Sequence, residues 1–203
     1  MPYPLTPKPG RPSGARPIVI TVLGAIVILL IVALISAGSP VTFIVGAIPS
    51  TAALIVCRLC YRGLARWEPE PTRLTVMALI WGGSAGVIFS FLVEMAVPAS
   101  EFVTMAIVAP LAEELAKASV FILVATGARK LELTSLTDHI FYAGICALGF
   151  AFVKNLGYFA LSSSAGEFVV MTLVRTGFGV FGHPLYTTAT AVGIWAWRTK
   201  VGL

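Results

Sequence analysis

Charge is scarce in this chain, and so are histidine and cysteine. Of its 203 residues 11% are charged, two are histidines and three are cysteines. A soluble domain carries about 25% charged residues, so this composition excludes an ordinary soluble domain. With 58% hydrophobic residues and a mean hydropathy of +0.94, the chain is expected to be an integral membrane protein. The net charge of +5 needs no nucleic acid to explain it, because membrane proteins concentrate Lys and Arg in cytoplasmic loops.

The cysteines offer no zinc or redox motif. Cys57 and Cys60 form CRLC near the end of an apolar segment, and Cys146 lies inside another. A zinc or redox site needs a second ligand pair or a soluble βαβ context, and the sequence has neither. We interpret Cys57 and Cys60 as small apolar side chains near a helix end.

Six apolar segments have the roughly 20 residues that a membrane span needs. They are residues 17–37, 40–60, 74–96, 103–126, 138–162 and 167–197. We therefore predict an all-α, polytopic transmembrane bundle of about six spans, within a range of six to eight, and no soluble domain. Its expected parts are a disordered cytoplasmic tail (1–16), two N-terminal transmembrane helices (17–60) and a core (61–203). The first segment lacks the cleavage site of a signal peptide and is expected to remain in the protein.

Lysine and arginine are absent from every second loop. All eleven loop cations lie in the two termini and in loops 58–73 and 127–137, whereas the other loops contain none. The positive-inside rule makes the basic side cytoplasmic, so both termini are predicted there. The last segment is longer than a bilayer needs. We expect its first ten residues, EFVVMTLVRT, at the outer interface, and a bend at the glycines and proline of 177–184.

Seven acidic, basic or histidine residues lie within the predicted spans and are not assigned to a loop or to a span boundary. Such groups are rare in membranes and usually face a bundle interior or a wet cavity. At 1.5 Å per residue, the ones on the last three spans fall at a similar depth in the outer half of the bilayer, and we expect them to converge. The seven are Glu94, Glu113, Glu114, Lys117, Lys154, Arg175 and His183.

Spacing supports a shared site. Glu113 and Glu114 are four and three residues before Lys117, which places all three on one helix face. Pro110 is expected to bend that helix, and His183 shares a face with Thr187.

Lys154 needs a partner, because a cation at that depth costs about 2.5–3.5 kcal/mol. An ion pair with Glu113 or Glu114 at about 4 Å would offset this by roughly 4 kcal/mol at an effective permittivity near 20. A network that only locks the helices together is the structural alternative.

The ordered motifs resemble a known family. "WEPEP" (67–71), "IWGG" (80–83), "EELAK" (113–117), "GFAFVKN" (149–155), Arg175 and "HPLYT" (183–187) follow one another on successive spans. This series is similar to the bacterial PrsW-type intramembrane proteases, which belong to the superfamily of CAAX prenyl endopeptidases and Abi proteins. The likeness covers about residues 67–190.

The resemblance implies hydrolysis of a peptide bond in a single-span membrane protein, such as an anti-sigma factor, in the bacterial plasma membrane. It implies that Glu113 and Glu114 supply the general base and that His183 completes water activation or stabilises the oxyanion. The supporting residues would be Lys117, Lys154, Asn155, Arg175 and Thr187. We expect no cofactor. The alternative is zinc, for which Glu113, Glu114 and His183 would be the ligands.

One residue departs from the family pattern. The family has a glutamate where this chain has Lys154, so the deep charges of Glu113, Glu114, Lys117 and Lys154 sum to zero. A base held in an ion pair is a weaker base. Three interpretations therefore stay open: a protease that is active or impaired by Lys154, a non-catalytic pseudoprotease that binds membrane helices, and a small transporter. The lack of a repeat and of paired broken helices argues against the transporter.

Overall fold

The described residues of the computed structural model form a helical bundle with no strand among them. They comprise residues 15–38, 40–64, 70–125, 133 and 135–200, so the predicted tail (1–16) lies almost wholly outside them. The helices are α1 (Ala15–Gly38), α2 (Pro40–Leu64), α3 (Thr72–Trp81), α4 (Val87–Ala96), α5 (Glu101–Val103), α6 (Ala109–Ala125), α7 (Leu136–Ala160), α8 (Ala165–Thr172) and α9 (Gly182–Lys200). Three π-helical turns join some of them without a break: η1 (Gly82–Gly86), η2 (Thr104–Val108) and η4 (Leu173–Phe178). The predicted all-α fold is confirmed.

Five helices of the described chain are long and apolar enough to cross a membrane. They are Ile18–Gly38, Pro40–Gly63, Thr72–Ala96, Leu136–Ala160 and Ala165–Lys200. The predicted span 103–126 corresponds to a helix of similar length, but Glu113, Glu114 and Lys117 lie within five residues of one another there. These three charged residues, close together in the sequence, set this segment apart from the other five.

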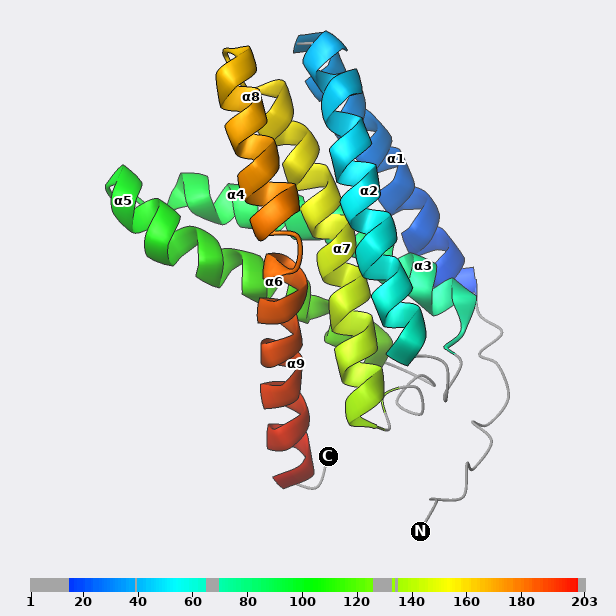
Figure 1. Ribbon diagram of the computed structural model, residues 1–203. Helices are drawn as coiled ribbons and strands as arrows, with labels where there is room; N and C mark the ends of the chain where they lie inside the picture. Colours follow the sequence, from blue (N-terminus) through cyan, green and yellow to red (C-terminus); the bar gives the residue numbers. More distant parts are fainter. Residues whose placement is uncertain (1–14, 39, 65–69, 126–132, 134, 201–203) are drawn as a thin grey trace.

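Helix α7 is the centre of the bundle. Figure 1 shows α1, α2, α7 and α8 running nearly parallel, while α3–α4 and α5–α6 cross them obliquely. Helix α7 packs against α2, α3, α6 and α9 and is buried over most of its length. A capping box between Ser135 and Asp138 starts α7 at Leu136.

Two glycines bring the backbones of α3–η1 and α7 into contact. A Cβ atom on Gly149 would lie 1.9 Å from the carbonyl oxygen of Leu79, and one on Gly82 would lie 1.9 Å from that of Cys146. Neither position has room for a side chain, because the atoms that a Cβ would meet are backbone carbonyl oxygens, which cannot rotate away as a side chain can. This contact fixes the face of α7 that carries Phe150 and Lys154.

Gly149→Ala is therefore expected to destabilise the protein. Overpacking costs about 1–3 kcal/mol even where side chains can yield, and here a backbone carbonyl must move. For a chain of this length each kcal/mol lowers the melting temperature by about 2–4 °C.

Gly157→Ala is the matched control for that measurement in detergent, since Gly157 lies on the same helix and a Cβ there meets nothing within 4 Å. Equal melting temperatures for the two variants would show that the close contact is not a constraint on the fold.

The last long segment breaks where the glycines predicted a bend. After η4 the chain leaves helical geometry at Gly179–Phe181 and α9 begins at Gly182. The expectation that its first ten residues lie at the outer interface stays a prediction; in the structure they belong to α8 and η4, and α8 runs alongside α7 (Figure 1). The rings of Phe159 and Phe168, 5.5 Å apart, contribute to this packing.

Candidate active site

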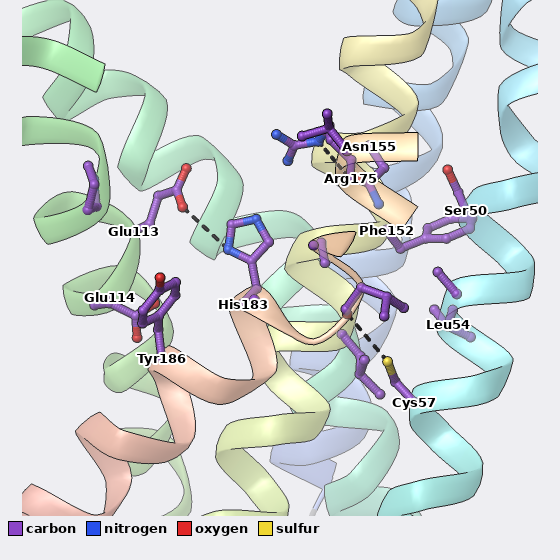
Figure 2. A pocket seen from close by; sticks show the side chains of 18 of the residues that line it. Ser50, Leu54, Cys57, Glu113, Glu114, Phe152, Asn155, Arg175, His183 and Tyr186 are labelled. Atoms are coloured by element: carbon purple, nitrogen blue, oxygen red, sulfur yellow. Dashed lines mark hydrogen bonds and ion pairs between the residues drawn. The ribbon is translucent and has the colours of Figure 1, made fainter. Parts of the chain in front are cut away.

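Charged side chains from four helices converge around Glu113. Lys154 Nζ of α7 lies 3.0 Å from Glu113 Oε1 of α6 and 3.5 Å from Glu94 Oε1 of α4. The other oxygen of the same carboxylate, Glu113 Oε2, lies 3.5 Å from His183 Nδ1 of α9. Figure 2 shows Glu113 and His183 pointing toward one another. Glu113 thus connects an ammonium group to an imidazole.

The neighbouring carboxylate, Glu114, is held on both oxygens. Lys117 Nζ lies 2.5 Å from its Oε1, and Lys117 is fully buried. The hydroxyl of Thr187 donates to Oε1 at 3.2 Å, and that of Thr190 donates to Oε2 at 3.3 Å. The spacing placed Lys117 on the same helix face as both glutamates, and of the two the structure pairs it with Glu114. The arrangement suits a structural anchor for α6 and α9.

Aromatic rings lie beside the cations of the site. The Lys117 ammonium lies 4.7 Å from the centroid of Phe150, and the Lys154 ammonium lies 5.7 Å from Phe150 and 5.9 Å from Tyr158. Phe150 also meets the imidazole of His183 edge to face at 5.3 Å. Phe150, Lys154 and Tyr158 are spaced by four and therefore share one face of α7. Cation–π contacts of this kind favour a buried charge.

The helix that carries both glutamates has an irregular start. The π turn η2 ends at Val108, two residues before Pro110. Proline lacks the N–H that an α-helix would use and its ring crowds the preceding turn, and a wider turn relieves both effects. Pro110 and the glutamates after it line the cavity described next.

A cavity of about 650 Å³ lies between α2, α6, α7, η4 and α9. Glu113, Glu114, His183, Asn155 and Arg175 form its polar wall, and most of the remaining lining is apolar. An apolar cavity with a few convergent polar groups is the usual form of a binding site. Other side chains that line it include Ser50, Leu54, Cys57, Phe152 and Tyr186 (Figure 2).

Asn155 and Arg175 form a second polar pair in the same cavity. Arg175 Nε donates to Asn155 Oδ1 at 2.8 Å, and the guanidinium lies 3.9 Å from the centroid of the Tyr158 ring. Both side chains are therefore fixed from α7 and η4, on the far side of the cavity from Glu114 in Figure 2.

The residues of the site do not fit a metal ion as they are arranged. A catalytic zinc takes three protein ligands and a water, and within the described ranges no three His, Cys, Asp or Glu side chains are grouped to provide them. Glu113 contacts the ammonium of Lys154, and His183 Nδ1 lies 3.4 Å from the ammonium of Lys117. Glu114 is engaged on both oxygens. Two fixed cations stand where a dication would have to bind.

The structure brings the sequence-predicted residues together, with one partner that had not been foreseen. One network of contacts joins Glu113, Glu114, Lys117, Lys154, Thr187 and His183. The same cavity is also lined by Asn155 and Arg175. The unforeseen partner is Glu94, the second carboxylate of Lys154. Its position inside an apolar span was a usable signal, but the comparison of depths covered only the last three spans and did not include Glu94.

Fold and site together define a polytopic helical membrane protein with a carboxylate–histidine pair in the wall of a partly open cavity. The comparisons with known proteins agree: the model of the PrsW family of intramembrane metalloproteases matches residues 70–201, and the chain belongs to this family. No curated protein and no solved structure matched it. Helices α1 and α2 precede the matched range, although α2 forms one wall of the cavity.

Proposed function

We propose that this chain hydrolyses a peptide bond of a membrane-anchored protein in the cavity, with water activated by Glu113 and His183. The observation that carries the proposal is the 3.5 Å approach of Glu113 Oε2 to His183 Nδ1 in the cavity wall. Glu113 takes a proton from the water while the water oxygen attacks the carbonyl carbon of the substrate. Glu113 then returns that proton to the leaving amine nitrogen as the C–N bond breaks. Family membership supports a protease of this general class.

The neighbouring groups supply orientation and charge stabilisation. We assign His183 Nδ1 as the acceptor toward the Lys117 ammonium, which can only donate, and Nε2 as the N–H that donates. With this tautomer Glu113 Oε2, 3.5 Å from Nδ1, is not hydrogen-bonded to the ring and remains able to accept the proton of a water between them. Asn155 accepts from Arg175 through Oδ1, which leaves its amide N–H groups to donate in the cavity. Donors from His183 and Asn155 would stabilise the oxyanion that forms on the carbonyl oxygen.

The proposed substrate is a single-span protein, such as an anti-sigma factor, in the bacterial plasma membrane. Leu111 and Tyr186 line the cavity and are also strongly exposed on the outside of α6 and α9. An apolar helix could therefore approach the cavity from the lipid. The mostly apolar lining of the cavity also strengthens the electrostatic interactions given above.

Cleavage of a single-span reporter in proteoliposomes tests this function. We expect cleavage by the wild-type chain to be lost in Glu113→Gln and His183→Ala. Glu167→Gln is the matched control, because Glu167 lies on α8 and bonds only to Ser163 and Ser164 within the described chain. Cleavage that persists in both site variants would refute the proposal.

A second function is favoured by the ion pairs themselves. Lys154 holds Glu113 and Lys117 holds Glu114, so both carboxylates are partly neutralised. A pseudoprotease would retain the reporter in the cavity without cutting it. A photoreactive amino acid placed at position 186 would test this. Capture of intact reporter, together with no cleavage by the wild-type chain, would favour this second function.

The proposed orientation places both termini in the cytoplasm. In a cysteine-free background, a cysteine at Ser164 is expected to react with an impermeant maleimide in intact cells. One at Thr199 is expected to react only after permeabilisation, because it lies beside the basic end of α9. The opposite pattern would invert the topology. The sequence also predicts labelling at residue 39, and none at residue 130 before permeabilisation; both positions lie outside the described residues.

A further inference from the structure

The ammonium of Lys154 occupies a position between carboxylates from two different helices. It lies 3.0 Å from Glu113 Oε1 and 3.5 Å from Glu94 Oε1, and its side chain is only 14% exposed. The faces of Phe150 and Tyr158 lie within 6 Å of it. Two kinds of contact, ion pairs with carboxylates and contacts with aromatic faces, therefore favour a positive charge at this place.

The groups around this charge have the chemistry of metal ligands. Carboxylate oxygens and a neutral imidazole are ligands that zinc and cobalt accept. Glu113 links them, since one of its oxygens faces Lys154 and the other faces His183. What the arrangement lacks is room for a second cation, because a dication beside Glu113 would lie a few ångströms from a fixed ammonium and be repelled by it.

We propose that Lys154 is a built-in cation that takes the place of a divalent metal ion. Its ammonium holds Glu94 and Glu113 together across α4 and α6 and keeps metal away from His183. Glu94, Glu113 and His183 are not grouped as a metal site while Lys154 is in place; without the ammonium, these three side chains close on a divalent cation. The inference goes beyond the proposed proteolysis and does not depend on it, because it concerns which cation the carboxylates hold.

Cobalt binding to the purified, detergent-solubilised chain tests the inference without any substrate. The variants are Lys154→Met, which removes the charge and keeps the length, and Lys154→Arg, which keeps the charge. Each is titrated with Co²⁺ by calorimetry and by visible absorption, and the protein carries no histidine tag. We expect one Co²⁺ per chain in Lys154→Met, bound about 10³-fold more tightly than by wild type or Lys154→Arg, because one charge repulsion is removed.

Second-site variants locate the bound ion. In the Lys154→Met background, Glu113→Gln or Glu94→Gln should abolish the cobalt spectrum, whereas Glu167→Gln should not. Lys154→Met that binds no Co²⁺ would overturn the proposal. The proposal would also be overturned if wild-type or Lys154→Arg protein bound one Co²⁺ per chain and lost it on Glu113→Gln. This second measurement does not depend on whether Lys154→Met folds.

Discussion

Glu113→Gln is expected to lower the rate of reporter cleavage by about 10²–10⁴-fold, the usual contribution of a general base. The substitution keeps the shape of the side chain and removes the proton acceptor nearest His183. It should leave the fold intact, because Lys154 retains Glu94 as a charged partner. The measurement is cleavage of the single-span reporter together with the melting temperature in detergent.

Glu114→Gln is the substitution to compare with Glu113→Gln, because the two glutamates are adjacent in the sequence and have different contacts. Within the described part of the chain, Glu114 is the one carboxylate that the buried Lys117 ammonium contacts. Removing one member of a buried pair costs about 3–5 kcal/mol, so Glu114→Gln should act first on stability. If Glu113→Gln unfolds the protein while Glu114→Gln only slows cleavage, the roles given to the two glutamates must be exchanged.

The sequence was sufficient for the helices and for most of the site's members. Apolar segments of span length predict the bundle, and the need of Lys154 for a partner predicts its pairing with the helix of Glu113. The start of α7 was also readable, since Ser135 and Asp138 have the spacing of a capping box, yet the span was predicted to begin at 138.

The remaining features depend on how the helices cross. Depth counted along the chain assumes upright spans, but α3–α4 and α5–α6 run obliquely, and this course is what brings Glu94 to Lys154 (Figure 1). The crossing in turn relies on Gly82 and Gly149. These two of the 19 glycines lie in the motifs IWGG and GFAFVKN, but the sequence does not indicate that their backbones meet. The π turns likewise arise from packing and from Pro110 rather than from a residue pattern.

Lys154→Glu is expected to destabilise the protein and to increase cleavage. The change removes the ammonium between Glu94 and Glu113 and places a third carboxylate beside them. Uncompensated buried charge costs about 3–5 kcal/mol, which corresponds to a fall in melting temperature of roughly 6–20 °C at 2–4 °C per kcal/mol. Cleavage should rise because Glu113, no longer held by an ammonium, is a stronger proton acceptor. Such an exchange of stability for activity is common at catalytic sites.

The melting temperature and the rate of reporter cleavage are both measured on one set of proteins, which separates the two effects. A chelator is present throughout, so that no metal ion replaces the lost charge. Lys154→Met is the control: it removes the ammonium without adding a carboxylate, and should lie between wild type and Lys154→Glu in melting temperature. The gained cleavage must disappear when Glu113→Gln is added. An inactive Lys154→Glu protein beside a wild type that cleaves the reporter would contradict this account, because the ammonium would then be required for the reaction rather than restraining its base.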